Sequence, residues 1–258
     1  MKHESTTRIE YGPVRAIAGV DTLSARSLRT SFDRHFHDTY AFGLILKGVE
    51  RCELRGARRF FEAGTVPMFN PGEVHDGGPA TEAGWSYRMV YVDPALVAQE
   101  RVFPLPQRRD APATGVARRL FDAIDCGSEL GIEEALTSAL EVLLDQAERD
   151  RGTPTALAKV RELLDAHCCE PVRLHDLSQV MGISATRLLR SFEAAYGLTP
   201  HRYQQSKRIA KARRMILAGT PLADVASACG YADQSHLNRW FLRIHGTTPG
   251  RLRRAFFS

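Results

Sequence analysis

The chain has 258 residues, of which 43% are hydrophobic and 25% are charged, and its formal net charge is +5 at pH 7. These values are typical of a soluble globular protein with one large or two ordinary domains. No run of about 18 apolar residues occurs, which excludes a membrane-spanning helix. Residues 1–15 lack the apolar core of a signal peptide and the cysteine count of 5 is odd, so we expect a cytoplasmic protein with free thiols.

Residues 30–95 have the pattern of a small antiparallel β-barrel or sandwich. Short apolar runs such as AFGLILKG (41–48) and RMVYV (88–92) are separated by turn residues such as Pro71-Gly72, which is typical of closely spaced strands. The interior of a small barrel can hold one small ligand. We therefore expect an effector site lined by candidates from this region, namely His37, Tyr40, Phe42, His75, Trp85, Tyr87, Arg88 and Met89.

The direction of Arg88 leaves two classes of effector open. Side chains alternate along a strand, so Trp85, Tyr87 and Met89 share one face and Arg88 lies on the other. An inward Arg88 would favour an anionic effector such as a carboxylate, because a guanidinium pairs with carboxylates. An outward Arg88 would suit a neutral or aromatic molecule better.

A leucine-rich stripe follows the predicted strands. Its residues recur at helical spacing within 132–147 and are Ile132, Ala135, Leu136, Ala139, Leu140, Leu143, Leu144 and Ala147. Such a stripe needs an apolar partner, which would be either a second copy of the chain or the rest of its own domain. The segment RDRGTPT (149–155) is the best linker candidate, so we expect an effector-binding and dimerisation domain at 1–150 and a second domain at 151–258.

The two predicted domains carry opposite charge. Residues 151–258 hold 17 Lys/Arg and 7 Asp/Glu, for a net charge of +10, which leaves 35 − 17 = 18 basic and 30 − 7 = 23 acidic residues, or −5, for residues 1–150. A strongly basic domain joined to an acidic one indicates that the second half faces a polyanion.

The basic half contains an internal repeat. Residues 174–200 match residues 222–249 with an offset of 48 before a central turn and 49 after it, and the matched pairs are Leu174/Leu222, Asp176/Asp224, Gly182/Gly230, Leu188/Leu237, Arg190/Arg239, Phe192/Phe241, Gly197/Gly246 and Pro200/Pro249. Each copy predicts a short helix, a glycine turn, a capping residue (Ser184 or Asp233) and a second helix. The pattern is helix-turn-helix, present twice.

A basic segment joins the two copies. Residues 201–219 predict one helix of about 18 residues, roughly 27 Å long at 1.5 Å per residue. This length can hold two recognition helices close to one DNA turn apart, about 34 Å, so that both enter successive major grooves. The basic residues of this helix are suited to backbone phosphates and are Arg202, Lys207, Arg208, Lys211, Arg213 and Arg214.

The exposed N-terminal part of each recognition helix supplies the candidate base contacts. Arg190 and Arg239 could each bond guanine O6 and N7 together, and Gln234 and Asn238 could bond adenine. The first helix could add contact with a thymine methyl. The predicted DNA-binding residues are Thr186, Arg187, Arg190, Gln234, Ser235, His236, Asn238 and Arg239.

These motifs resemble those of the AraC/XylS family of bacterial transcription regulators. The second copy, PLADVASACGYADQSHLNRWFLRIHGTTPGRLRR, carries that family's arrangement across its length, and residues 30–95 resemble its cupin-type sensor domain more loosely, through RHFHDTYAFGLILKG and NPGEVHDG. The resemblance implies a two-domain α+β fold. A small cupin-like β-barrel with following helices would precede an all-α domain of two helix-turn-helix motifs joined by a long helix. The named base-contact positions match those of the family.

The histidines of RHFHDTY raise the question of a metal. Cupin enzymes hold a metal with His-x-His, a nearby carboxylate and a later histidine. In this sequence the carboxylate position would fall near Ala41 or Phe42, so the acidic ligand is missing. His35, His37 and His75 remain the candidates for a three-histidine site, which suits zinc with an open position, while Glu73 or Asp38 could supply a carboxylate only with a different spacing. Histidines in a sheet more often make structural hydrogen bonds, so we expect no metal and no cofactor.

The sequence therefore predicts a sequence-specific DNA-binding transcription regulator, not an enzyme, that responds to a small-molecule effector. Its partners would be double-stranded DNA, the effector, a second copy of the chain and RNA polymerase, with no membrane contact. Two alternatives stay open: a dioxygenase-like cupin metalloenzyme with a helical appendage, and a constitutive DNA-binding protein whose barrel only dimerises.

Overall fold

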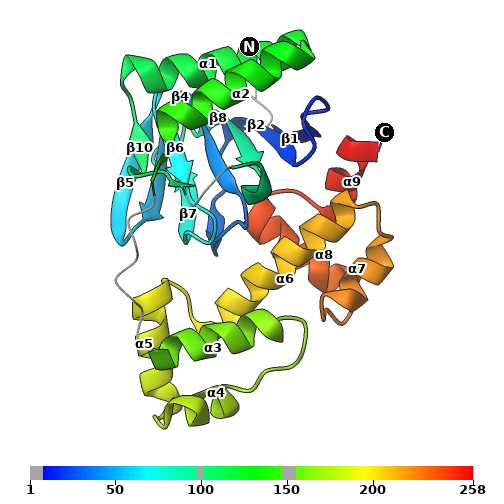
Figure 1. Ribbon diagram of the computed structural model, residues 1–258. Coiled ribbons are helices and arrows are strands. Elements are labelled where there is room, and N and C mark those ends of the chain that lie inside the picture. The colour runs from blue at the N-terminus through cyan, green and yellow to red at the C-terminus, as the bar shows by residue number, and fades with distance from the viewer. Residues whose placement is uncertain (1–7, 98–100, 147–154, 258) are drawn as a thin grey trace. The chain divides into compact units, whose positions relative to one another are not determined.

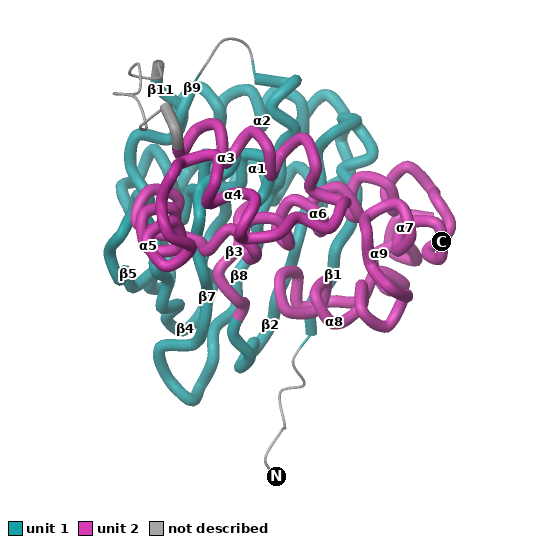
Figure 2. Tube along the Cα trace, turned by 90° about the horizontal axis from the view of Figure 1, so that it is seen from below, with its two compact units in different colours: residues 1–31, 37–148 teal, residues 32–36, 149–258 magenta. Residues whose placement is uncertain are grey.

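The computed structural model describes residues 8–97, 101–146 and 155–257. The chain forms two compact units, coloured separately in Figure 2: unit 1 comprises residues 1–31 and 37–148, and unit 2 comprises residues 32–36 and 149–258. The predicted linker at 149–155 lies, apart from Thr155, outside the described residues, so the boundary at Asp150/Arg151 stays a prediction.

Unit 1 is built mainly of antiparallel strands followed by two helices. Its main strands and helices are β1 (Arg8–Pro13), β2 (Val20–Leu28), β4 (Tyr40–Leu54), β5 (Ala57–Glu62), β6 (Val66–Phe69), β7 (His75–Pro79), β8 (Trp85–Val92), β10 (Gln107–Arg108), α1 (Ala111–Cys126) and α2 (Glu129–Leu143). Three short elements, η1 (Pro94–Leu96), β9 (Arg101–Val102) and β11 (Asp145–Gln146), complete it, and β9 pairs with β11.

The long strand β4 belongs to two parts of the β structure. The strand order of the larger part is β1-β2-β8-β4-β6-β10, in which the first half of β4 pairs with β8 and β6. A register shift between Ile45 and Lys47 then redirects β4. Its second half pairs with β5 and β7, so β4 links both halves of an enclosed, cupin-like β structure.

Helices α1 and α2 cover one face of this β structure (Figure 1). Alternate residues of β4 and β8, among them Phe42 and Val90, point toward the helices and are buried there with Leu120 and Leu136. This alternation follows from the two-residue period of a strand. Helix α1 begins after Asp110, whose side chain accepts a hydrogen bond from the backbone N–H of Ala113.

The leucine-rich stripe of α2 packs inside its own unit. Ile132, Leu136, Ala139 and Leu143 are buried in the core shared with α1 and the sheet. The sheet and α1 therefore supply the apolar partner of these four residues, Ala147 lies outside the described residues, and a dimer stays a prediction. The described part of the chain contains no helix that is long and apolar enough to cross a membrane.

Unit 2 contains β3 and the helices of the basic half. Its elements are β3 (Phe32–His35), α3 (Thr155–Ala166), α4 (Leu174–Met181), α5 (Ala185–Tyr196), α6 (Pro200–Leu217), α7 (Leu222–Ala228), α8 (Gln234–His245) and α9 (Pro249–Phe257). Figure 1 shows α6 running between the group α3–α5 and the group α7–α9. The observed fold class is therefore the predicted one, an α+β chain with a β-rich first part and two helix-turn-helix motifs joined by a long helix.

Candidate functional site

The first recognition helix, α5, exposes its N-terminal polar residues. Ser184 caps the helix by accepting a hydrogen bond from the backbone N–H of Arg187, and Thr186, Arg187 and Arg190 are exposed. Leu188 is buried on the opposite face, as is Phe192. The matched leucine and phenylalanine thus fix which side of α5 faces solvent.

The second recognition helix, α8, repeats this arrangement. Asp233 caps it by accepting a hydrogen bond from the N–H of His236, while Leu237 and Phe241 are buried. The predicted contact residues Gln234, Ser235, Asn238 and Arg239 are exposed. The His236 ring is half-buried and lies 5.2 Å from the Tyr231 ring, so this residue also packs against the preceding turn.

Helix α6 is more deeply buried than its basic sequence suggests. The Arg208 side chain donates from Nε to Cys168 O at 2.6 Å, from Nη1 to Gly230 O at 3.0 Å and from Nη2 to Glu170 O at 2.9 Å. These carbonyls belong to the α3–α4 loop and to the α7–α8 turn. The interpretation of Arg208 as a phosphate contact is wrong, because its guanidinium is buried and joins the two motifs.

Two lysines of α6 are also engaged within unit 2. Lys207 Nζ lies 3.3 Å from an Asp165 carboxylate oxygen, and Lys211 Nζ donates to Ala228 O at 3.2 Å. Arg202 and Arg214 are exposed, and their contact with phosphates stays a prediction. Spacing alone could not separate these roles, because all six basic residues fit a helix.

In unit 1, β8 presents an aromatic face to the interior, away from α1 and α2. Trp85 and Tyr87 stack with ring centroids 5.8 Å apart, and Tyr91 stacks on Tyr11 at 6.4 Å. The His37 ring lies 5.3 Å from the Tyr91 ring and 5.1 Å from the His75 ring. Four of the eight effector candidates, His37, His75, Trp85 and Tyr87, therefore lie among these aromatic groups, and Met89 is buried on the same face of β8.

Three effector candidates lie on the other face. Arg88 points toward α1, where Nη1 and Nη2 bond both carboxylate oxygens of Asp125 at 2.7 and 2.8 Å and the guanidinium lies 4.5 Å from the centre of the Phe121 ring. Tyr40 and Phe42 are buried in the core beneath the helices, and the Tyr40 hydroxyl donates to Arg101 O. The alternation of side chains along a strand places all three on the helix-covered face.

Glu50 is an interior residue that sequence reasoning missed. Burial, together with the nearby charge of Asp76, raises the pKa of Glu50 to about 8, so the carboxyl group is largely protonated at neutral pH. Tyr87 lies close enough to interact with Glu50, and burial raises the pKa of that phenol as well. The only feature of the sequence that could have marked Glu50 is its alternation with Cys52 and Leu54, which are also buried.

The three candidate metal ligands divide between the two units. His37 and His75 belong to unit 1, where their ring centroids lie 5.1 Å apart, and His35 belongs to unit 2. His35 Nδ1–H donates to Asp33 O at 2.6 Å and His75 Nδ1–H donates to Glu73 O at 2.8 Å. Both bonds leave Nε2 as the lone-pair nitrogen, which is the arrangement that orients histidine ligands around a metal. Burial lowers the pKa of His75 to about 4, so that ring is neutral at pH 7.

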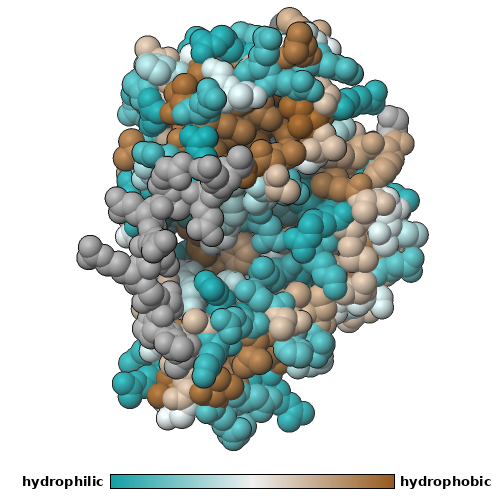
Figure 3. Space-filling view, viewed as in Figure 1, coloured by the Kyte–Doolittle hydropathy of each residue, from teal (hydrophilic) through white to brown (hydrophobic). Residues whose placement is uncertain are grey.

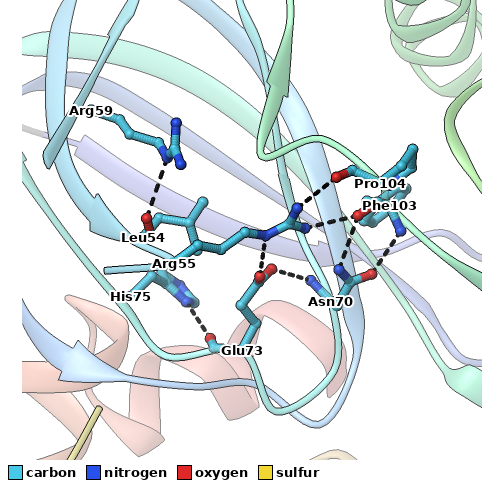
Figure 4. A network of polar contacts seen from close by, with 8 residues as sticks. All are labelled: Leu54, Arg55, Arg59, Asn70, Glu73, His75, Phe103 and Pro104. Carbon is cyan, nitrogen blue, oxygen red and sulfur yellow. Dashed lines mark hydrogen bonds and ion pairs between the residues drawn. The ribbon is translucent and has the colours of Figure 1, made fainter. Parts of the chain in front are cut away.

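Glu73 does not complete this cluster. Its carboxylate accepts hydrogen bonds from Arg55 Nε and from the backbone N–H of Asn70, and Arg55 also donates to the carbonyl oxygens of Phe103 and Pro104 (Figure 4). This network holds the loop that carries His75. A three-imidazole metal site made of His35, His37 and His75 stays a prediction.

Comparisons with known proteins agree with this architecture. Residues 17–140 match the family model of the AraC-like ligand binding domain, and residues 177–255 match that of a helix-turn-helix domain. The HTH-type transcriptional activator RhaS of Escherichia fergusonii is 30% identical over 266 residues, which cover 95% of each chain. The HTH-type regulator YbfI of Bacillus subtilis is 27% identical over 240 residues, covering 84% of this chain and 86% of that protein.

Solved structures share the fold. ToxT of Vibrio cholerae matches with a TM-score of 0.54 at 11% identity, covering 94% of this chain and 100% of that one. The repeated helix-turn-helix motif, the preceding β domain and the relatives all lead to one assignment. The chain belongs to the AraC/XylS family of transcription regulators and combines an AraC-like ligand-binding domain with a DNA-binding helix-turn-helix domain.

Proposed function

We propose that the exposed N-terminal residues of α5 and α8 read base edges in successive major grooves, and that a small molecule inside unit 1 controls this binding. One observation carries the DNA-binding assignment: Arg190 and Arg239 occupy the same position in the two motifs, and both are exposed. Neither forms an ion pair with another described residue, so both guanidinium groups are available to DNA. Selection of bound sequences from a random DNA pool tests the proposal.

Replacing Arg239 with alanine should weaken specific DNA binding by about 1–3 kcal/mol, because a bidentate guanine contact is worth that much discrimination. Repeating the DNA selection with the variant should also show relaxed preference at one base position. Arg251→Ala, an exposed arginine on α9, is the matched control and should leave the preferred sequence unchanged. An unaltered preference in Arg239→Ala would remove Arg239 from the base-contacting set.

The effector is proposed to be neutral or aromatic. Arg88, the residue that would have recognised an anion, is paired with Asp125 beneath the helices, and the interior carries Glu50 and aromatic rings instead. Thermal-shift screening against neutral aromatic compounds and their carboxylate analogues tests this choice. The hits should lose their effect in Tyr87→Ala and keep it in Arg88→Gln; stabilisation by carboxylates alone would contradict it.

A homodimer, contact with RNA polymerase and a cytoplasmic location are also proposed. Two features support a dimer: Leu130 of α2 is 67% exposed, and Figure 3 shows hydrophobic residues along the α1–α2 pair on the face in view. The relatives named transcriptional activators support contact with RNA polymerase. Sedimentation of wild type and Leu130→Glu tests the dimer.

The second candidate function, a metal-dependent enzyme, is favoured by the histidine cluster alone. The relatives are transcription regulators, and we propose that this chain is likewise not an enzyme. If the cluster holds a metal, stoichiometric zinc should remain after dialysis of the purified protein, and His75→Ala should lower the bound zinc at least about tenfold, because one of three ligands is lost. Metal analysis of the two proteins gives the answer, with His175→Ala, outside the cluster, as the control.

A further inference from the structure

The loop between α3 and α4 holds two adjacent cysteines that no part of the DNA-binding role explains. The Sγ atoms of Cys168 and Cys169 lie 3.6 Å apart, and both side chains are partly exposed. Of the other three cysteines, Cys52 is buried and Cys126 is exposed, both on unit 1, and Cys229 is buried near the pair with its Sγ 3.9 Å from Met215 Sδ. The pair is therefore the accessible dithiol of the chain.

A lysine contacts one of the two sulfurs. Lys211 Nζ donates a hydrogen bond to Cys169 Sγ at 3.3 Å. Arg208 lies beside the same loop, with Nε bonded to Cys168 O. The surroundings of the two sulfurs are thus cationic.

The geometry suits one atom shared by both sulfurs better than a bond between them. A disulfide needs an S–S distance of about 2.05 Å and Cα atoms usually about 4.4–6.8 Å apart, but Cα atoms of adjacent residues are only about 3.8 Å apart. A tetrahedral ion about 2.3 Å from each sulfur would instead hold them roughly 3.7 Å apart. The observed separation is 3.6 Å, so the pair needs little movement to chelate a single thiophilic atom.

The ligand count selects among thiophilic atoms. A structural zinc ion needs four ligands, and in the described part of the chain no third metal-binding side chain forms a group with these sulfurs. A trivalent arsenic atom that carries one organic group needs only two thiols and yields an uncharged product.

We propose that Cys168 and Cys169 form a binding site for monosubstituted trivalent arsenicals. Each thiol replaces one hydroxyl group of R–As(OH)2: two As–O bonds break, two As–S bonds form, and the two thiol protons leave with the hydroxyl groups as two water molecules. No electrons are transferred, so the step requires no oxidant or reductant.

The site is placed to influence DNA binding, an effect that rests on the proposed function. A Cβ atom added at Gly230, in the α7–α8 turn, would lie 2.1 Å from Cys169 O, so the dithiol loop and this turn are in close contact. Arg208 bonds Cys168 O and Gly230 O together. The added bulk of an arsenic atom and its organic group beside this loop would disturb its contact with the turn, and with it the spacing of the two motifs.

Phenylarsine oxide is the probe for the site itself. Intact-mass analysis of the reduced full-length protein should show one adduct per chain, resistant to excess 2-mercaptoethanol and removed by ethanedithiol. Cys168→Ser and Cys169→Ser should lose the adduct, while Cys126→Ser and Cys229→Ser should keep it. Retention of the adduct in Cys168→Ser would overturn the proposal. Serine preserves the side-chain size, and circular dichroism confirms that each variant is folded.

DNA binding by the same samples tests the coupling. The adduct should weaken the affinity of wild type for its selected DNA about tenfold, within the usual range of coupling between two sites, and leave Cys168→Ser unaffected. An adduct without a change in affinity would overturn the coupling and leave the site standing. Failure of the unmodified protein to select any DNA would instead overturn the proposed function, so the two failures are distinguishable.

Discussion

Replacing Arg208 with alanine is expected to lower the free energy of unfolding of unit 2 by about 3–5 kcal/mol. The guanidinium is buried and donates to three carbonyl oxygens from two separate turns. Removing it leaves these acceptors without their charged donor, and each hydrogen bond to a charged group is worth about 1.5–3 kcal/mol. Urea denaturation of the full chain, followed by the helical circular dichroism signal, measures the loss.

Two further variants sharpen this test. Arg208→Lys keeps the charge but replaces the planar fork by one nitrogen, so it should recover less than half of the lost stability. Arg187→Ala removes an exposed arginine from the same unit and should change the free energy of unfolding by less than about 0.5 kcal/mol. Equal behaviour of Arg208→Ala and Arg187→Ala would show that the three hydrogen bonds add nothing to stability.

Replacing Glu50 with glutamine should stabilise unit 1 at alkaline pH. Burial and Asp76 raise the pKa of Glu50 from an ordinary value of 4.5 to about 8. Between these values the unfolded chain releases the proton and the folded chain keeps it, so the wild type loses stability as the pH rises from 4.5 to 8. The difference of about 3.5 pH units, at about 1.4 kcal/mol each, sets an upper value near 5 kcal/mol.

Glutamine resembles the protonated carboxyl group and does not titrate, so Glu50→Gln should exceed the wild type by about 3–5 kcal/mol at pH 8.5 and match it near pH 4.5. Thermal unfolding at the two pH values measures this. His75, whose pKa burial lowers to about 4, weakens both proteins in acid and cancels from the difference. The same gain at both pH values in Glu50→Gln would contradict the titration.

Local patterns predicted unit 2 well. The capping roles of Ser184 and Asp233 and the buried positions of Phe192 and Phe241 follow from spacing within one turn of helix. Each of these features depends on residues only a few positions away. The internal repeat gave the same pattern a second time, so the second helix of each motif was predicted to begin after its capping residue, as observed for α5 and α8.

Unit 1 depends on contacts between distant segments, and there the predictions were weaker. Whether Tyr40 or Arg88 faces the interior is decided by helices α1 and α2, which follow the strands by many residues and cover one face of the sheet. The register shift after Ile45 brings Glu50 inside. No local sequence pattern marks this register shift. Arg208 was misassigned for the same reason, because its acceptors lie 22 to 40 residues away.

The length of α6 sets the phase between the two motifs. The helix has 18 residues, and each residue added or removed would turn one motif against the other by about 100° while moving it by about 1.5 Å. Such a rotation would prevent the two recognition helices from entering successive major grooves of one DNA duplex at the same time. If the proposed function holds, substitutions at the base-contacting positions would change the preferred DNA sequence, whereas a change in the length of α6 would disrupt binding to any DNA sequence.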